Sequence, residues 1–257
     1  MRILAFYSFK GGVGKTGAAV NVAAEAAADG LPTLLWDMDP QAASSWILGH
    51  DGGLEAGARK LFTGRTPIGR EIMRTPWESL DLLPAARGYR HLDALLAEQT
   101  EKPEKVLGDL LRPLSERYAL VIIDCPPSYS RLAEALFRVT DLFAVPLVPS
   151  PLSARVWHEL QEHFRKKELP RKRLLPFLSL VDRRRRMHRD LLASTPPAFQ
   201  RQLDAWIPSA SVAERMAETR APVRAYAPRS PVAGAYKRLW RELEQRLTEV
   251  SQRNRLS

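Results

Sequence analysis

A glycine-rich stretch near the amino terminus carries the residue types that bind phosphate groups. It reads FKGGVGKTG over residues 9–17 and directly follows an apolar run, Ile3–Ser8. Glycines let successive backbone N–H groups turn toward one point, and the amino terminus of a following helix adds partial positive charge. Lys15 would reach the outer phosphates of a nucleotide, and the hydroxyl of Thr16 would bind Mg²⁺. The stretch therefore predicts a phosphate-binding loop.

The same loop contains a second lysine, Lys10. The common pattern G-x-x-x-x-G-K-[ST] would place its first glycine at Phe9, so this loop departs from that pattern. A glycine-rich turn with solvated lysines is the simpler interpretation of the composition. The strand expected before the loop and the helix expected after it favour phosphate binding instead.

Two aspartates follow other apolar runs. Asp39 comes just after Thr33–Met38, and Asp124 ends Ala119–Asp124. The carboxyl ends of parallel strands meet at one edge of a sheet, where ligands bind, so both carboxylates are expected near the loop. An aspartate in such a place is often a turn residue or a helix cap. Beside a phosphate loop, Asp124 is predicted to hold Mg²⁺ through water.

The elements that position these residues alternate along the chain. Nearly continuous apolar runs predict strands buried on both faces, at Ile3–Ser8, Thr33–Met38, Leu80–Pro84, Ala119–Asp124, Leu142–Val148 and Leu174–Val181, with a short one at Trp206–Ile207. Helical patterns cover Gly14–Ala28, Pro103–Arg117, Ser130–Val139, Ala154–Lys167, Arg189–Leu203 and Val232–Val250. Residues 50–79 are expected to be irregular with at most one short helix. The alternation predicts an α/β fold, a doubly wound, mostly parallel sheet with helices on both faces, in a single domain over residues 1–257.

The composition limits the class of protein. The chain has 257 residues, 45% hydrophobic and 26% charged, enough for one large core or at most two small domains. Its single cysteine, Cys125, excludes a disulfide framework and a metal site built from several thiolates of one chain, and it is expected to be a small buried residue. No signal-peptide pattern and no window near ~18 apolar residues is present, so a cytoplasmic, soluble protein is expected.

Several blocks together resemble the ParA/MinD family of deviant Walker-A ATPases, over nearly the whole chain. These blocks are KGGVGKT at Lys10–Thr16, DMDPQ at Asp37–Gln41, VIIDCPP at Val121–Pro127, VPLVPSPLS at Val145–Ser153 and the stretch from Ile207 to Tyr236. The last block is more similar to the ParA side of the family, and without a DNA-binding module before Met1 the chain resembles the short ParA type. The resemblance implies a P-loop NTPase-like fold.

The resemblance also assigns roles, which are expectations here. Lys10 matches the signature lysine, which in an ATP-bound dimer crosses to the phosphates of the partner. Asp39 would position the attacking water, with Asp37 supporting the outer shell of the metal. Thr16 and Asp124 would hold Mg²⁺. The residues expected to contact ATP are Lys10, Gly11, Gly12, Val13, Gly14, Lys15, Thr16, Gly17 and Pro208, the last through adenine.

One of these positions departs from the family. The family usually carries Thr or Ser at the position of Gly17, where a hydroxyl touches the α-phosphate. The backbone N–H of Gly17 remains, so binding is expected to survive. Glycine in a first helical turn costs roughly 1 kcal/mol against alanine, so a weaker affinity or a more mobile loop is expected.

The net charge of +10 and the pI near 10.0 point to a polyanionic partner. Basic residues gather in the second half, at Arg165–Lys167, Arg171–Arg173, Arg183–Arg186 with Arg189, and Lys237–Arg238 with Arg241. A solvated cationic surface is the simpler interpretation. Relatives bind DNA without sequence preference through such residues, so nonspecific DNA binding and association with the nucleoid are expected, with strong salt dependence.

The last predicted helix has an apolar stripe at helical spacing, formed by Tyr236, Leu239, Trp240, Leu243, Leu247 and Val250. In MinD-like relatives a terminal amphipathic helix binds membranes. Packing on the sheet is the favoured interpretation here, because a terminal helix of a doubly wound domain should cover it and glutamates dilute the positive face.

The functional hypothesis is therefore a Mg²⁺-dependent ATPase that dimerises with ATP, binds nucleoid DNA, and partitions or positions a cargo with the help of an adaptor that stimulates hydrolysis. A MinD-like membrane-associated ATPase is one alternative. An ATP-dependent metabolic ligase on the same fold is another. Lys10 argues against the ligase, since an intersubunit lysine serves a switch rather than small-substrate chemistry.

Overall fold

Seven strands form one sheet in the part of the chain that the computed structural model describes, residues 1–193, 199 and 201–256. The strands are β1 (Arg2–Phe6), β2 (Thr33–Asp37), β3 (Met73–Arg74), β4 (Leu80–Leu83), β5 (Leu120–Asp124), β6 (Leu142–Leu147) and β7 (Leu174–Leu178). Their order is β3-β4-β2-β5-β1-β6-β7, and only the pairing of β3 with β4 is antiparallel. The predicted mostly parallel sheet is confirmed.

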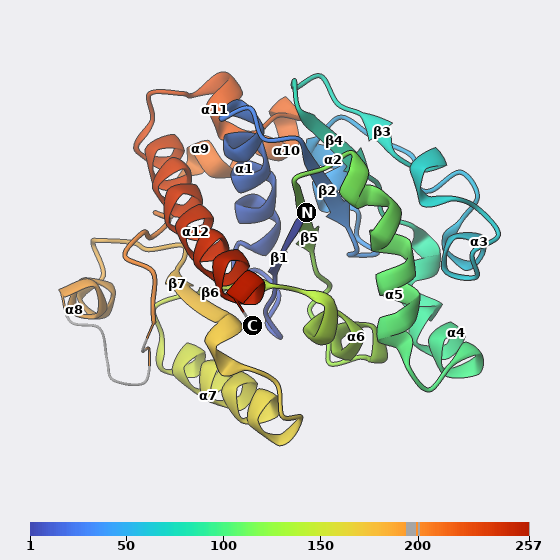
Figure 1. Cartoon of the computed structure of the whole chain (residues 1–257). Coiled ribbons are helices and arrows are strands. Elements are labelled where there is room, and N and C mark those ends of the chain that lie inside the picture. Colours follow the sequence, from blue (N-terminus) through green and yellow to red (C-terminus); the bar gives the residue numbers. More distant parts are fainter. Residues whose placement is uncertain (194–198, 200, 257) are drawn as a thin grey trace.

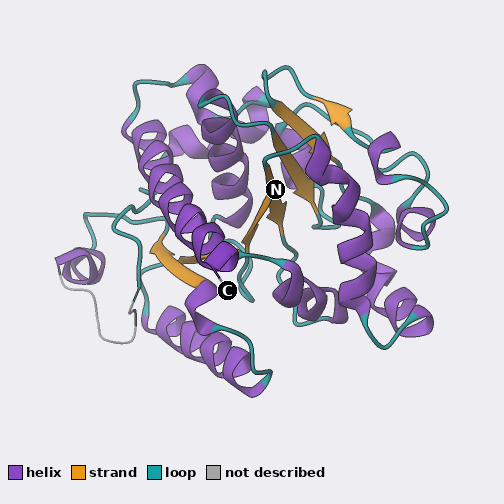
Figure 2. Cartoon of the chain, viewed as in Figure 1, coloured by secondary structure: helices purple, strands orange, loops and turns teal. Residues whose placement is uncertain are grey.

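Helices cover both faces of this sheet (Figure 1, Figure 2). They are α1 (Lys15–Ala28), α2 (Ala43–Ile47), α3 (Ala58–Phe62), α4 (Leu92–Gln99), α5 (Pro103–Leu111), α6 (Arg131–Val139), α7 (Pro151–Lys166), α8 (Arg186–Ala193), α9 (Ser211–Glu214), α10 (Met216–Thr219), α11 (Val223–Tyr226) and α12 (Pro231–Leu256). Short 3₁₀ turns follow α3 at Ile68–Arg70, precede α4 at Arg87–His91, follow α5 at Arg112–Glu116 and precede β7 at Arg171–Arg173.

The alternation of side chains along β1 explains the two layers. Leu4 and Phe6 pack with α1 and α12 on one face, whereas Ala5 and Tyr7 pack with α4 to α7 on the other. Figure 1 shows these two groups of helices on opposite sides of the strands. Burial on both faces is why the strands read as continuous apolar runs. The doubly wound architecture is confirmed.

Helix α12 buries the predicted apolar stripe. Leu239, Trp240 and Leu243 are fully buried against the α1 side of the sheet. The indole N–H of Trp240 also donates to Asp29 Oδ2 at 2.8 Å, which joins α12 to the end of α1. The expectation that this stripe packs on the sheet is confirmed. Among the described residues, no helix has the length and apolarity needed to cross a bilayer.

The prediction of a helix over Arg189–Leu203 is wrong at its carboxyl end. Helix α8 ends at Ala193, and the backbone N–H of Leu203 donates to the carbonyl of Pro176 at 2.8 Å, beside β7. Residues 194–198 and 200 lie outside the described residues. Two consecutive prolines stand within the predicted range, and proline removes a helical hydrogen bond. The carboxyl end of this helix was predicted from apolar residues at helical spacing, and that pattern was not sufficient there.

Two other regions differ in detail from expectation. The expected strand at Trp206–Ile207 is absent from the described structure, and the next residue, Pro208, forms a single parallel bridge with Val181. Residues 50–79, expected to be irregular with at most one short helix, hold α3, a 3₁₀ turn and the edge strand β3. The edge strand is only two residues long, and its sequence carries no alternation that could reveal it.

Candidate nucleotide-binding site

The glycine loop lies where the order of the sheet reverses. From β1 the chain passes through the loop into α1 and then to β2, whereas β6 lies on the other side of β1. Open α/β sheets bind ligands at the carboxyl ends of the strands at such a switch point. The loop between β1 and α1 therefore stands at the place that the fold makes available for a ligand.

Two glycines give the loop its shape. Gly12 and Gly14 have φ values of 70° and 89°, in the left-handed region that favours glycine. A Cβ on Gly14 would also lie 2.8 Å from the Oγ of Ser179, at the end of β7. Gly14 is the N-cap of α1, and the first N–H groups of a helix have no partner within the helix. These groups can bind an anion.

The two lysines of the loop have different surroundings. Lys15 is 6% exposed at the start of α1, whereas Lys10 is exposed, as are the neighbouring Gly11 and Gly12. The backbone N–H of Lys10 donates to Ser8 Oγ at 3.2 Å, which fixes the backbone at Lys10 but leaves its side chain on the surface. The loop therefore presents one cation inside the site and one to the outside.

The strand ends bring two buried carboxylates together. Asp37 and Asp124 are register partners in β2 and β5, and both are fully buried. Ser44 Oγ donates to Asp124 Oδ2 at 2.7 Å. Both the N–H and the Oγ of Ser45 donate to Asp37 Oδ2 at 2.8 Å. Helix α2 thus supplies a hydrogen-bond donor to each carboxylate.

Several of the other predicted site residues are close enough to Asp124 to affect its pKa. Burial raises the pKa of Asp124, and Asp39 raises it further, while Ser44, Thr16 and Lys15 lower it. Burial also raises the pKa of Asp37, and the charge of Asp124 adds to that rise. A nearby cation would stabilise both charged carboxylates. The structure therefore gathers Lys15, Thr16, Asp39 and Asp124 in one place.

The residues at this place fit a hydrated Mg²⁺ ion. Asp124 Oδ1 is buried and accepts no hydrogen bond from the described residues, whereas Oδ2 is bonded to Ser44. Carboxylate and hydroxyl oxygens are the ligands that Mg²⁺ takes, often with water between. Asp124 and Thr16 are the residues that would hold it.

Asp39 and Pro208 lie at the same edge of the sheet. The backbone N–H of Asp39 donates to Asp37 Oδ1 at 3.1 Å, and its own Oδ1 accepts from the N–H of Gln41 at 2.9 Å. Pro208 pairs with Val181, just beyond the carboxyl end of β7. Their roles toward water and adenine stay predictions.

Gly17 stands close to side chains of two later helices. A Cβ on Gly17 would lie 3.1 Å from Met216 Cε and 3.3 Å from the hydroxyl of Tyr236. Asn21 binds the same turn, because its Nδ2 donates to the carbonyl of Gly17 at 2.7 Å. A side chain at position 17 would therefore fit only if Met216 of α10 and Tyr236 of α12 moved by a few tenths of an ångström.

Sequence reasoning missed Ser44 and Ser45. The available signal was a pair of adjacent hydroxyl residues a short distance after a strand-end carboxylate. Such a pair is common in loops, and its meaning depends on the turn at Ala42, whose φ of 55° starts α2. Cys125 is buried beside Asp124, as expected.

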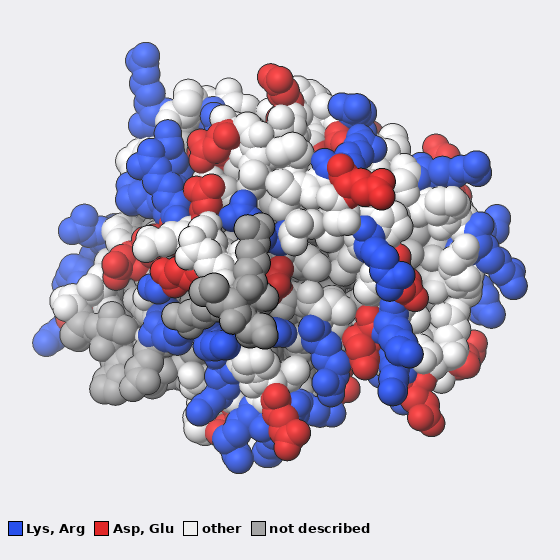
Figure 3. Space-filling model, viewed as in Figure 1, with Lys and Arg blue, Asp and Glu red and all other residues white. Residues whose placement is uncertain are grey.

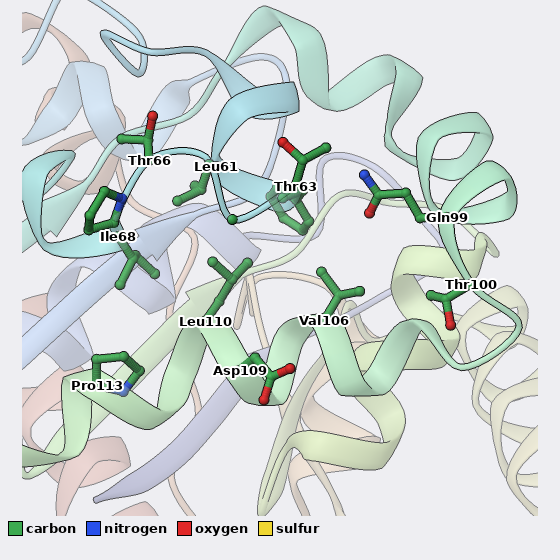
Figure 4. A pocket seen from close by; sticks show the side chains of 13 residues that line it. Leu61, Thr63, Thr66, Ile68, Gln99, Thr100, Val106, Asp109, Leu110 and Pro113 are labelled. Carbon is green, nitrogen blue, oxygen red and sulfur yellow. The ribbon is translucent and has the colours of Figure 1, made fainter.

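A separate cavity lies away from this site (Figure 4). It has a volume of about 530 Å³ and lies between α3 and α5, with Leu61, Ile68, Val106 and Leu110 among its lining residues. None of the residues predicted to bind nucleotide or metal lines it. It therefore has no part in the candidate nucleotide site.

Comparisons of the sequence with known proteins give a consistent set of relatives. The family model described as AAA domain, AAA_31, matches residues 1–172. Chromosome partitioning protein ParA of Myxococcus xanthus is 35% identical over 147 residues, 57% of this chain and 52% of that protein. Virulence plasmid ParA family protein pGP5-D of Chlamydia psittaci is 31% identical over 166 residues, 63% of this chain and 62% of that protein. The match thus spans about half to three-fifths of the length of these relatives.

Solved structures share the fold over almost the whole chain. The septum site-determining protein MinD of Pyrococcus horikoshii, complexed with Mg-ADP, has a TM-score of 0.75 at 22% identity, covering 94% of this chain and 95% of that one. Cobyrinic acid a,c-diamide synthase of Mycobacterium smegmatis, with a bound ATP analogue and magnesium, has a TM-score of 0.76 at 27% identity, covering 95% of each chain. Because the family model covers well over half of its residues, from the glycine loop past the Asp124 strand, the chain belongs to the ParA/MinD family of deviant Walker-A ATPases.

Proposed function

We propose that this chain is a Mg²⁺-dependent ATPase that dimerises with ATP, binds DNA without sequence preference, and partitions or positions a cargo. The observation that carries the proposal is the pair of lysines in the glycine loop. Lys15 lies inside the site beside Asp124, and Lys10 faces outward. An enzyme acting alone needs only the first, and we infer that the second serves a partner subunit, as in the family that the chain belongs to.

Within one subunit, each group has a distinct task in ATP binding. The N–H groups of the loop and the start of α1 bind phosphate oxygens, and Lys15 neutralises the outer phosphates. Asp124 and Thr16 would hold Mg²⁺, which would supply charge neutralisation at the phosphate oxygens. Asp39 orients the water that attacks the γ-phosphate. Ser44 and Ser45 keep the carboxylates of Asp124 and Asp37 in place by hydrogen bonds.

Lys10 provides the connection to the partner. It stands beside two exposed glycines whose added Cβ atoms would have no heavy atom within 4 Å among the described residues beyond their chain neighbours, so the loop surface is accessible to a second molecule. Facing triphosphates repel each other, and a cation supplied in trans offsets that repulsion. ATP therefore favours the dimer, and hydrolysis removes the preference.

The basic residues of the second half support DNA binding. Lys166, Arg171, Lys172, Lys237 and Arg238 are exposed. Figure 3 shows Lys and Arg side chains over the left and lower parts of the face where Figure 1 places α12, α8 and α7. Some members of the predicted clusters form ion pairs, as Arg165 does with Glu162 and Lys167 with Glu134, and these contribute less to an anion site. Contacts to phosphates alone suffice for nonspecific binding.

The two alternative functions, a membrane-associated ATPase and a metabolic ligase, receive less support than the partition ATPase. The apolar stripe of α12 is buried against the sheet over the described part of the helix, with Leu239, Trp240 and Leu243 fully buried, so it is not presented to a membrane in this conformation. The likeness to cobyrinic acid a,c-diamide synthase supports a ligase as the second candidate function, since that protein binds an ATP analogue on the same fold. A ligase needs a small carboxylate substrate for turnover, whereas the proposed switch hydrolyses ATP slowly alone and faster with an adaptor protein and DNA.

Replacing the buried lysine tests the ATPase proposal. Lys15→Ala should abolish ATP binding measured by calorimetry with Mg²⁺, because the loop N–H groups alone do not neutralise a triphosphate. Lys60→Ala, which removes an exposed lysine of α3, is the control and should bind like the wild type. Unchanged affinity in Lys15→Ala would remove that residue from the site. Turnover without added small substrate then separates the switch from the ligase.

A further inference from the structure

Helix α2 lies between the buried carboxylates and a distant part of the chain. Its inner residues, Ser44 and Ser45, donate to Asp124 and Asp37. Its next residue, Trp46, is 46% exposed and donates its indole N–H to the carbonyl of Ala217 in α10 at 2.8 Å, across 171 sequence positions. One short helix therefore contacts the candidate metal ligand on one side and the C-terminal segment on the other.

Arg220 holds the outer side of α2 through three further contacts. Its guanidinium lies over the indole of Trp46, 4.2 Å from the ring centroid. Its Nε donates to the carbonyl of Trp46 at 3.2 Å, and its Nη2 pairs with Asp51 at 2.5 Å, just beyond α2. A cation over an indole face is attracted by the ring, and the three contacts restrain the position of the helix.

Arg220 has an unusual backbone conformation. Its φ is 49°, in the left-handed region that residues other than glycine rarely adopt. This conformation ends α10 and directs the chain onward to α11. A half-exposed tryptophan that is both a hydrogen-bond donor and a stacking surface is therefore a specific contact rather than a loose surface side chain.

The opposite side of α10 contacts the first helix of the site. Met216 lies against Gly17, and its sulfur accepts from Asn21 Nδ2 at 3.0 Å. Asn21 Oδ1 in turn accepts from the N–H of Val223 at 2.8 Å. The segment from α10 to α11 thus touches both the phosphate-loop helix and α2.

We propose that Trp46 and Arg220 are positioning residues of the nucleotide site. Their contact fixes α2, and α2 holds the hydroxyls of Ser44 and Ser45 against the two buried carboxylates. The proposal rests on the proposed ATPase function, because it concerns the same site. A shift of about 1 Å in such a site can lower a rate about 100-fold even when the mutation is remote.

The test compares Trp46→Ala and Arg220→Ala with Arg117→Ala. Arg117 is a matched control at the opposite end of the sheet, because it also lies over an aromatic ring, Tyr118, and pairs with an aspartate, Asp81. Two quantities are measured, hydrogen exchange of the backbone amides of residues 43–48 without nucleotide, and the kcat and KM for ATP.

Both variants of the Trp46–Arg220 contact should exchange faster over residues 43–48, where the amide of Ser45 is held by Asp37. Their kcat should fall about tenfold with a smaller change in KM, as expected when the reacting groups are misplaced and binding is retained. Trp46→Phe keeps a ring beneath the guanidinium and should keep at least half of the wild-type kcat. Arg117→Ala should change neither quantity.

Wild-type exchange over residues 43–48 together with a kcat equal to that of Arg117→Ala would overturn the positioning role. The failure of the underlying function has a different signature. A wild-type chain that neither binds nor hydrolyses ATP would contradict the ATPase proposal, while the exchange measurement would still decide whether the contact holds α2. A melting temperature for each variant identifies any that fail to fold, and the other alanine variant of the Trp46–Arg220 contact then carries the test.

Discussion

Lys10 and Lys15 stand in one loop, yet the structure surrounds them differently. Lys15 begins α1, is almost fully buried and influences the pKa of Asp124, whereas Lys10 faces solvent. A buried ammonium needs an anionic partner, so Lys15 requires either the carboxylate or a phosphate. The exposed Lys10 is solvated and needs no anionic partner within its own subunit. The separate roles proposed for the two side chains follow from this difference in burial.

Replacing Asp39 should separate ATP binding from hydrolysis. Asp39→Ala should retain ATP affinity, because the loop, Lys15 and Asp124 remain, and should slow hydrolysis about 100-fold by the loss of the group that orients water. Single-turnover hydrolysis and calorimetry measure the two quantities. Asp109→Ala, on α5, is the control. Hydrolysis at the wild-type rate in Asp39→Ala would show that another group positions the water.

Replacing Gly17 with alanine tests whether crowding by neighbouring side chains or the low helix propensity of glycine has the larger effect on stability. Propensity alone predicts that Gly17→Ala stabilises the first turn of α1 by up to about 1 kcal/mol. The added Cβ would meet Met216 Cε at 3.1 Å, and Met216 is held by Asn21, so crowding of about 1–3 kcal/mol should exceed that gain. The melting temperature should therefore fall.

The matched control for Gly17→Ala is Gly108→Ala in α5. A Cβ on Gly108 would meet no atom within 4 Å, so that variant should be stabilised by about 0.5–1 kcal/mol. A rise in melting temperature for both variants would show that Met216 yields easily and that space does not explain the glycine at position 17.

The residues of the site were predictable from sequence to different degrees. Lys15, Thr16 and Gly14 lie within a few positions of each other, so local pattern revealed them. Ser44 could not be found in this way, because its partner Asp124 is 80 positions away. The Trp46–Arg220 contact spans 174 positions, and neither residue belongs to a recognisable motif. Contacts of this range depend on the folded sheet.

Helix α12 permits a prediction about its attachment to the sheet. Leu243 is fully buried, so Leu243→Ala should lower the free energy of unfolding by about 2–5 kcal/mol, through lost burial and the cavity that remains. Denaturant unfolding measures the loss. Gln245→Ala, at an exposed position of the same helix, should cost less than about 0.5 kcal/mol. Equal stability of the two variants, with binding to anionic vesicles, would indicate a detachable helix and favour the membrane alternative.

Prediction of the elements succeeded where local signals agreed. Helix α6 begins after Ser130, whose Oγ accepts from the N–H of Ala133 at 3.1 Å. Serine is one of the residues preferred at this capping position, so the start of the helix is visible in the sequence. The predicted helix at Arg189–Leu203 agrees with α8 over Arg189–Ala193 and is wrong at Leu203, whose N–H donates to Pro176 beside β7. The short helices α9, α10 and α11 were missed, since four residues carry too little periodicity to distinguish a helix from a turn.

In the molecule as a whole, the residues of the candidate site lie at one edge of the sheet, where β1, β2 and β5 end. The register of β2, β5 and β1 sets Asp37, Asp124 and Phe6 side by side, and the glycine loop follows β1 directly. Lys10 is the exposed cation of that loop, and exposed basic residues of the second half, such as Lys166, Lys172 and Lys237, belong to later elements. We expect ATP bound at the edge to affect DNA binding through a change in the assembly.

Replacing Lys10 tests whether the change lies in the assembly. Lys10→Ala should leave nucleotide binding by the monomer mostly intact, because Lys15, Thr16 and the loop backbone remain. Dimerisation should fail, since two facing triphosphates would lack a bridging cation and repel each other. DNA binding should fail with it, because one subunit offers about half of the phosphate contacts and affinity depends steeply on their number.

Sedimentation with a slowly hydrolysed ATP analogue and Mg²⁺ measures the dimer, and DNA binding at moderate salt follows on the same samples. Lys60→Ala again controls for the loss of one positive charge, and its dimer and DNA affinity should match the wild type within about twofold, as for one surface charge far from a phosphate. If Lys10→Ala dimerised and bound DNA like this control, Lys10 would be only an exposed lysine. The charge that links two subunits would then have to come from another residue at the loop surface, and ATP-dependent dimerisation would lose its physical basis in this loop.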